Sequence, residues 1–235
     1  KRYKVPRLVF INKMDRVGSD PFKAIKDLRE KLNHNAVAVQ IPIGAEDLFE
    51  GVVDLVTMKA FYNDGEKGQD VIEKEIPTDL LDFANEKRAE MLEALSMFDD
   101  QMMEDLLEGK EISEESIHKA IWEGVNSLEL TPVFMGSAFK NKAVQPMLNA
   151  LCRYLPSPVE SKPMIATQVD DETKQIELAP DKNKPLVCMA FKIADEKFGQ
   201  LTYVRIYQGT LKKGSNIFNT RTGKKIRVGR LVRMH

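Results

Sequence analysis

Short apolar runs and amphipathic stretches alternate along the first two thirds of this sequence. The first apolar run, residues 5–11, stops abruptly at polar residues, which is typical of a buried parallel strand. Ser19-Asp20-Pro21 then predicts a helix start, with an N-cap residue and a proline in the first turn. Apolar residues at helical spacing give this helix one hydrophobic face: Phe22, Ile25, Leu28 and Leu32. A strand, a loop and a helix form half of a βαβ unit, and the loop leaves the strand end where open α/β sheets bind ligands.

The alternation continues to residue 155. These elements are expected in chain order: strands within 37–44 and 51–62, a turn at Gly65 and Gly68, a helix over 78–98, and two helices with Asp99 and Ser113 as N-caps. Residues 131–141 then repeat the opening pattern, an apolar strand that breaks into small and polar residues. A helix over 143–155 follows it. The order of elements predicts an α/β domain over residues 1–155.

The character of the chain changes after "PSPVESKP" (156–163), a segment punctuated by prolines. We expect a domain boundary there, with residues 156–183 as linker and domain entry. Four short strand-like runs joined by glycine-rich turns follow: "PLVCMAFKI", "LTYVRIYQG", "SNIFNTRTG" and "KKIRVGRLVRM". This spacing is typical of an all-β barrel or sandwich. Because a barrel needs more strands than these to close, we expect residues 184–235 to be an incomplete barrel.

Charge is divided unevenly between these two parts. Residues 184–235 carry twelve Lys and Arg against two acids, a net of +10, while the remainder carries 23 bases against 34 acids, a net of −11. Such a split suggests two modules with different partners, the basic one facing a polyanion. No apolar stretch reaches the length of a membrane span, so no membrane is expected. Cys152 and Cys188 lack partners at metal-ligand spacing, which predicts two reduced thiols in a cytosolic protein.

The polar stop after the first strand, Asn12-Lys13-Met14-Asp15, suits recognition of guanine. An aspartate accepts two hydrogen bonds in one plane, and guanine offers a ring N–H beside an amino group, a pair of donors that adenine lacks. An Asn can reach the base N7 or brace the loop, and a Lys can lay its methylene stem over the base. The alternative is ordinary turn chemistry, since short polar clusters after strands are common.

The second strand end, "GSAFK" (136–140), supplies what the first lacks. Its small residues allow the backbone to approach a ligand closely. We expect the backbone N–H of Ala138 to donate to guanine O6, a position where adenine carries a donor of its own. Ser137 is expected to brace the loop of Asp15, and Lys140 either approaches the ligand or caps a helix.

These motifs resemble those of the translational GTPases, and most closely the elongation factor G family of ribosomal translocases. "FINKMDR" and "GSAFKNKAVQPMLNALCRYLPSP" resemble the family's two guanine-recognition motifs and the end of its GTPase domain. "QIPIGAEDLFEGVVDL" resembles the subdomain that the family inserts between them, here about 36–128, and the chain from "LTYVRIYQG" onward resembles its β-barrel second domain. The resemblance implies a partial P-loop GTPase-type α/β domain with an inserted α+β subdomain, followed by the incomplete barrel. It also implies the guanine-site residues: Asn12, Lys13, Met14 (mainly through its backbone), Asp15, Ser137, Ala138 and Phe139.

Other parts of the family pattern have no counterpart in this sequence. No G-x-x-x-x-G-K-[ST] phosphate loop occurs, and the nearest spacing, "GTLKKGSN" (209–216), is expected to be a β-turn. The family's Mg²⁺-binding segments are also absent from this chain. We therefore expect a middle fragment of a translocase that binds GTP or GDP weakly and does not hydrolyse GTP by itself. Release factor three, a ribosome-protection protein and a non-enzymatic ribosome-binding module are the alternatives.

The resemblance also implies the ribosome as partner. The basic strand is expected to face ribosomal RNA with Lys224, Lys225, Arg227, Arg230 and Arg233, although such a strand also protects a sheet edge from aggregation. Residues 99–123 hold nine acids and two Lys, and are expected either to face a ribosomal stalk protein or to be a solvated helical face. The candidate acids are Glu104, Glu108, Glu111, Glu114 and Glu115. A monomer in the cytoplasm or an organellar matrix is expected.

Overall fold

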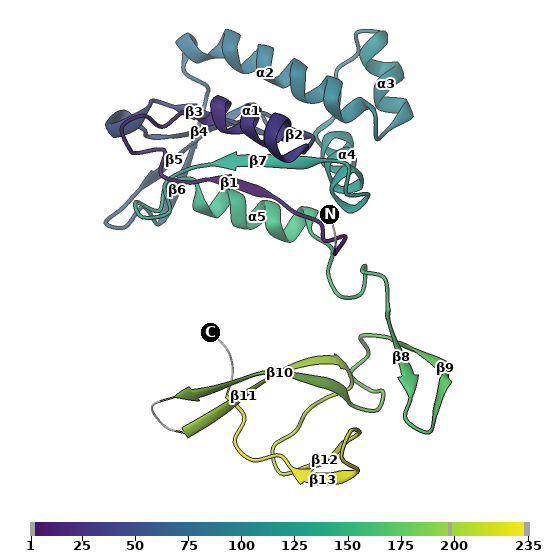
Figure 1. Ribbon diagram of the computed structural model, residues 1–235. Coiled ribbons are helices and arrows are strands. Elements are labelled where there is room, and N and C mark those ends of the chain that lie inside the picture. Colours follow the sequence, from purple (N-terminus) through teal and green to yellow (C-terminus); the bar gives the residue numbers. More distant parts are fainter. Residues whose placement is uncertain (1–2, 197–198, 233–235) are drawn as a thin grey trace. The chain divides into compact units, whose positions relative to one another are not determined.

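The chain divides into two compact units, Lys1–Pro156 and Ser157–His235, each of which is described here by itself. The computed structural model describes residues 3–196 and 199–232 (Figure 1). None of the helices in this described part is long and apolar enough to cross a membrane.

A three-stranded parallel sheet forms the centre of the first unit. Its order is β1 (Val9–Ile11), β7 (Thr131–Met135) and β2 (Ala36–Ala38), with β7 in the middle. Helix α1 (Pro21–Leu32) and helix α5 (Val144–Tyr154) cover opposite faces of this sheet (Figure 1). All five residues of β7 are buried, as expected of a central parallel strand. The carboxyl ends of β1 and β7 therefore meet at one edge.

The first unit also contains a four-stranded antiparallel sheet. In sequence, its strands follow β2 and precede the next helices of the same unit. Its strands follow chain order: β3 (Gln40–Ile43), β4 (Gly51–Asp54), β5 (Lys59–Asp64) and β6 (Asp70–Lys74). Helices α2 (Thr78–Ser96), α3 (Asp100–Leu107) and α4 (Glu114–Asn126) come next. One hydrophobic cluster joins this sheet, these helices and β7, and it includes Ile41, Leu95, Ile121 and Phe134. The two sheets thus share a core.

Local sequence patterns correctly predicted most of these helices and strands. Three predicted N-caps are confirmed, because Asp20, Asp99 and Ser113 each accept a hydrogen bond from the backbone N–H three residues on. The segments 37–44 and 51–62 each hold two strands in place of the single strand that we expected. In the first, β2 and β3 belong to different sheets, and in the second a turn separates β4 from β5. In that turn the Asp54 carboxylate accepts the N–H groups of Val56 and Thr57.

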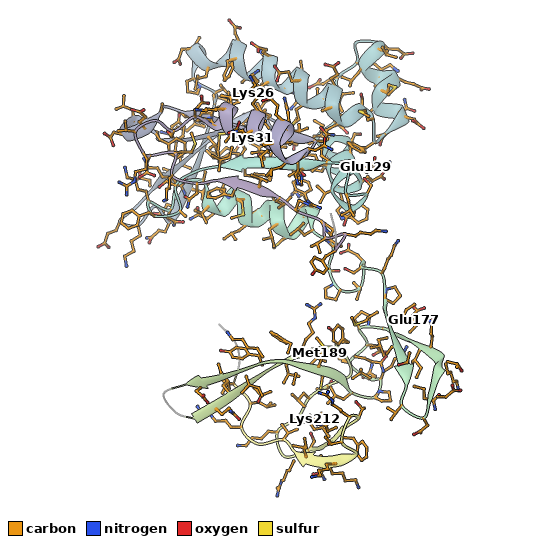
Figure 2. All side chains as sticks on the ribbon, viewed as in Figure 1. Lys26, Lys31, Glu129, Glu177, Met189 and Lys212 are labelled. Carbon is orange, nitrogen blue, oxygen red and sulfur yellow. The ribbon has the colours of Figure 1, made fainter. Side chains whose placement is uncertain are left out.

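The second unit consists of three two-stranded antiparallel ribbons in its described part. They pair β8 (Met164–Gln168) with β9 (Asp171–Leu178), β10 (Val187–Glu196) with β11 (Gly199–Gln208), and β12 (Asn216–Asn219) with β13 (Lys224–Arg227). Met189 lies on β10 and Lys212 in the loop after β11 (Figure 2). The four strands expected after residue 184 are present, and the expected turn at 209–216 joins β11 to β12. The ribbon β8–β9 occupies the segment that we expected to be linker, and the incomplete barrel stays a prediction.

Candidate nucleotide-binding site

Two loops at one edge of the parallel sheet carry the predicted site: the first base loop (residues 12–19) after β1 and the second base loop (residues 136–142) after β7. Backbone hydrogen bonds continue past the strands and hold the loops together. The N–H of Gly136 donates to Ile11 O at 3.0 Å, and the N–H of Met14 donates to Gly136 O at 3.1 Å. A Cβ at residue 136 would lie 2.4 Å from Lys142 O and 2.8 Å from the Phe10 ring, so glycine is required there.

Asn12 ties the two loops through its side chain. Its Oδ1 accepts the N–H of Lys13 at 2.8 Å and the N–H of Ala138 at 2.9 Å. The first bond supports Lys13 in a left-handed conformation, with φ at 66°. The Ala138 N–H, which we expected to donate to a base oxygen, donates to Asn12 in this structure. A bound base would compete with Asn12 for this donor.

Asp15 presents a buried carboxylate at the same edge. The residue is 6% exposed. The Ser137 hydroxyl hydrogen-bonds to this carboxylate and is the main cause that lowers its pKa below the ordinary value of 3.8. Burial opposes this shift, and the positive charges of Lys140 and Arg16, whose nitrogens lie 3.7 and 4.0 Å away, support it. Asp15 is therefore ionised at neutral pH and acts only as a hydrogen-bond acceptor. The expected bracing by Ser137 is present.

Met14 and Phe139, the two large apolar residues of the predicted site, have opposite environments. The Met14 side chain is 1% exposed and packs in a cluster with Phe49, Val52 and Met135. Its backbone carbonyl accepts a hydrogen bond from the Ser19 hydroxyl at 2.9 Å. Met14 thus anchors the first base loop and leaves only its backbone near the site. Phe139 is 91% exposed, and its ring faces solvent at the tip of the second base loop.

Residues outside the two motifs also hold the loops, and no local pattern in the sequence pointed to them. The Glu46 carboxylate accepts the N–H of Gly18 in the first base loop at 2.6 Å. The Lys142 ammonium donates to Phe49 O at 2.5 Å, and Asn63 Oδ1 accepts the N–H of Ala143 at 2.7 Å. Glu46, Phe49 and Asn63 belong to the segment around the antiparallel sheet. That segment therefore supports both base loops.

The acidic segment forms a hollow of about 350 Å³ between α3 and α4. Of the five candidate acids, Glu111 and Glu115 line it, together with Asp99, Asp105 and one base, Lys119, so that acids outnumber bases by four to one. Glu108 instead forms an ion pair with Lys110. A second hollow, of about 410 Å³, is lined by residues of α1, α2 and β2, among them Lys26 (Figure 2). Neither hollow includes a base-loop residue.

The basic strand β13 divides its charges between two faces. Register pairs Lys225 with Phe218 and Arg227 with Asn216, so these two bases share one face of the ribbon. Lys224 lies on the other face, with Ile226, which corrects the prediction of a single row of bases. Arg230 follows the strand, and Arg233 lies outside the described residues. Within the described part of the chain, no group of three or more Asp, Glu, His or Cys residues is placed to hold a metal ion.

Comparison with known proteins gives matches over both units. The family model described as the elongation factor Tu GTP binding domain matches residues 1–157, and that of elongation factor Tu domain 2 matches residues 199–235. The chain is 54% identical over its whole length to elongation factor G 1 of Borreliella afzelii and 52% identical to elongation factor G of Rhodopirellula baltica, and covers 34% of each. A crystal structure of a Thermus thermophilus protein aligns with 97% of this chain and 31% of its own, with a TM-score of 0.73 and 27% identity.

Proposed function

The chain belongs to the family of elongation factor Tu GTP-binding domains, and we propose that it is the guanine-recognising part of a ribosomal translocase of the elongation factor G kind. It spans about a third of the length of the curated relatives it matches. In this proposal the whole protein hydrolyses GTP and moves tRNA and mRNA on the ribosome. Residues 1–155 form the last part of the GTPase domain, with an insert at about 36–128, and residues 184–235 form part of the barrel domain.

The observation that carries the proposal is the ionised carboxylate of Asp15 beside the Asn12–Ala138 link. An ionised carboxylate accepts two donors, and the ring N–H and 2-amino group of guanine supply them side by side. The Ala138 N–H then donates to O6 of the base. Adenine presents its 6-amino group to that donor and no donor pair to Asp15, so two donors would face each other and the Asp15 carboxylate would gain no hydrogen bond from the base.

The remaining predicted residues have supporting roles in this arrangement. Lys13 lays its stem along the base, and Ser137 keeps the Asp15 carboxylate charged and in place. Met14 fixes the position of the first base loop through its buried side chain. Phe139 reaches the ligand only from the exposed tip of its loop. The ligand is GTP or GDP. None of the residues assigned here contacts its phosphates or their Mg²⁺.

The ribosome is the proposed partner, in the cytoplasm. The hollow between α3 and α4 presents Glu111 and Glu115, for which the described residues contain no ion-pair partner, and this negative surface suits a basic stalk protein. Lys225 and Arg227 are exposed on one face of β13 and suit RNA phosphates.

Release factor three, a ribosome-protection protein and a non-enzymatic module are less well supported than a translocase. Curated relatives above 50% identity carry the name elongation factor G. Their similarity extends over the whole chain, including the segment between the base loops.

A change of base preference tests the guanine site. In the full-length gene product, Asp15→Asn should weaken GDP binding and favour xanthosine diphosphate, because xanthine replaces the 2-amino donor with a carbonyl that accepts from the Asn amide. Competition against a fluorescent GDP analogue measures both affinities. Asp47→Asn, an exposed change outside the loops, is the matched control and should leave the preference unchanged. Unchanged GDP affinity in Asp15→Asn would refute the assignment of Asp15.

A further inference from the structure

A cluster of three side-chain amides joins the antiparallel sheet to the second base loop. Asn63 on β5 donates to Gly68 O at 3.0 Å and to Gln145 Oε1 at 3.0 Å. Gln145 and Asn141 also donate to Gly68 O, at 3.2 and 3.1 Å. One carbonyl in the β5–β6 turn thus collects donors from the sheet, from the second base loop and from α5.

The same cluster fixes the end of the second base loop. Asn63 Oδ1 accepts the N–H of Ala143 at 2.7 Å, and Ala143 is the N-cap of α5 without a side-chain cap of its own. Asn63, 80 residues away in sequence, accepts the N–H of the N-cap residue itself, the bond that an N3 side chain makes in a capping box. Its amide is therefore used at both ends, as donor to the turn and as acceptor from the loop.

The backbone of this loop needs external support. Asn141 and Ala143 both have positive φ, at 51° and 59°. A left-handed conformation costs about 1–2 kcal/mol for a residue with a side chain, and persists only where the surroundings over-determine it. Hydrogen bonds between Ser137 and Lys142, in both directions at 3.0 and 2.9 Å, close the loop into a tight ring. A shift at Ala143 would therefore be transmitted to Ala138.

Contact with the β5–β6 turn is close at the backbone level as well. A Cβ at Gly68 would lie 2.9 Å from Lys140 O and 3.2 Å from Asn141 O. Gly68 also has a φ of 61°, which disfavours any other residue. The turn and the second base loop therefore fit together only with glycine at this position.

We propose that Asn63 is a positioning residue for the second base loop, and that it sets how strictly the site recognises the 6-oxygen of guanine. The proposal rests on the proposed function, in which the Ala138 N–H donates to O6. The first base loop has separate supports in Glu46 and Ser19. Asp15 also has the Arg16 charge beside it, although Ser137 of the second base loop contributes to its position. Loss of Asn63 should therefore impair recognition at position 6 of the base more than recognition of the 2-amino group by Asp15.

Two base analogues separate these effects. Inosine diphosphate lacks only the 2-amino group, whereas 6-thioguanosine diphosphate keeps both donors and replaces O6 with a weaker acceptor. Binding of GDP and of each analogue to the full-length gene product gives two penalties, the ratio of each analogue's Kd to that of GDP. In Asn63→Ala, we expect GDP to bind roughly threefold to tenfold more weakly, as for the loss of about one hydrogen bond. The 6-thio penalty should fall towards one, and the inosine penalty should change much less.

Three further variants make this test specific. Asn63→Asp keeps the acceptor for the Ala143 N–H but loses the donor to Gly68 O and Gln145 Oε1, so it should retain part of the 6-thio penalty. Gly68→Ala displaces the loop from the turn and should reproduce Asn63→Ala; it also serves if Asn63→Ala fails to fold. Glu66→Ala, an exposed change in the same turn without an ion pair or hydrogen bond among the described residues, should match the wild type.

The outcomes discriminate between the possible roles. If both penalties shrink together in Asn63→Ala, or neither changes, Asn63 is merely structural and the proposal is overturned. If the wild-type protein binds GDP no better than inosine diphosphate, the guanine site itself is wrong, and the proposed function and this inference fail together.

Discussion

Asn12 accepts a hydrogen bond from the backbone of Ala138, 126 residues further along the chain, with 2.9 Å between Oδ1 and N. The same oxygen accepts the N–H of Lys13, the next residue. One side-chain atom therefore links the loops that follow β1 and β7. The parallel pairing of these strands brings the loops together, and Asn12 fixes their relative position.

Substitutions of Asn12 test whether this link positions the site for nucleotide. Asn12→Ala removes the acceptor for both N–H groups and should weaken GDP binding about tenfold. Asn12→Asp retains the acceptor and should bind GDP more tightly than the Ala variant. Dissociation of a fluorescent GDP analogue from the full-length gene product measures both. Equal losses in the two variants would show that the Oδ1 link alone does not position the site, and an unaffected Ala variant would contradict any role in binding.

Asp99 should stabilise the first unit as the N-cap of α3. Its carboxylate accepts the Met102 N–H at 3.1 Å and pairs with Lys119, whose Nζ lies 3.1 Å away. Asp99→Ala should lower the free energy of unfolding by about 1 kcal/mol, as for other lost N-caps. Urea unfolding followed by circular dichroism measures this. Lys119→Gln removes only the ion pair, so a loss as large as that of Asp99→Ala would contradict the capping role.

The pH dependence of Asp99 has a defined sign. The Met102 N–H and then Lys119 lower its pKa below the ordinary value of 3.8. A carboxyl with a depressed folded-state pKa contributes stability above its unfolded pKa and loses it as the pH falls through the folded one. The difference in free energy of unfolding between wild type and Asp99→Ala should therefore be constant near neutral pH. It should disappear only below about pH 4.

His118 should make stability depend on pH in a higher range. Arg153 can only donate, so Nε2 of His118 accepts from it, and the Nδ1–H donates to the Tyr154 hydroxyl at 2.7 Å. Burial, and then the Arg153 charge, lower the pKa of His118 to about 4 from 6.5. The unfolded chain therefore binds the proton more readily, and stability should fall as the pH drops from 6.5 towards 4. His118→Gln should flatten this slope in thermal unfolding, and an unchanged slope would contradict the neutral His118.

Local chemistry explains what the sequence could predict. The N-caps at Asp20, Asp99 and Ser113 depend on residues three positions apart, and the strand ends at Ile11 and Met135 coincide with abrupt polar stops. The pairing of Asp15 with Ser137 followed from the order of two strand–loop–helix patterns. Predicting these features requires only short-range sequence patterns and the assumption that two strands pair in parallel.

Contacts that depend on packing could not be predicted in the same way. Asn63 and Glu46 support the base loops from 80 and 28 residues away, and neither position has a distinctive local pattern. The opposite faces of Lys224 and Lys225 are an exception, because the two-residue period of the predicted strand already separates them and the expectation of a single row of bases overlooked it. The β8–β9 ribbon was missed because its exposed strands lack a clear apolar alternation.

The hollow between α3 and α4 should attract a basic partner by long-range electrostatics. Glu111→Lys with Glu115→Lys reverses two charges that line it and should slow association with the proposed partner, a basic surface of a ribosomal stalk protein, several-fold, with little change in dissociation. Surface plasmon resonance at two ionic strengths measures both rates. Glu104→Lys with Glu108→Lys, on the same segment but outside the hollow, is the matched control. Equal effects of the two pairs would indicate a general charge effect and no docking at the hollow.

Lys225 and Arg227 should contribute to RNA binding as a pair, because they share one face of the β12–β13 ribbon. Each phosphate contact releases counterions, so its loss lowers the salt dependence of binding as well as the affinity. Changing both residues to Gln should reduce the slope of log K against log salt by about 2, or about 1 for each residue. Filter binding of the full-length gene product to small ribosomal subunits over a salt series measures the slope.

Lys224→Gln provides the control for this prediction within the same strand. It removes the same charge from the adjacent position, but from the face that carries Ile226. We expect its salt slope to stay within experimental error of the wild type. If Lys224→Gln lowers the slope as much as Lys225→Gln does, the basic strand acts through its net charge alone, and the assignment of one RNA-facing side would be wrong.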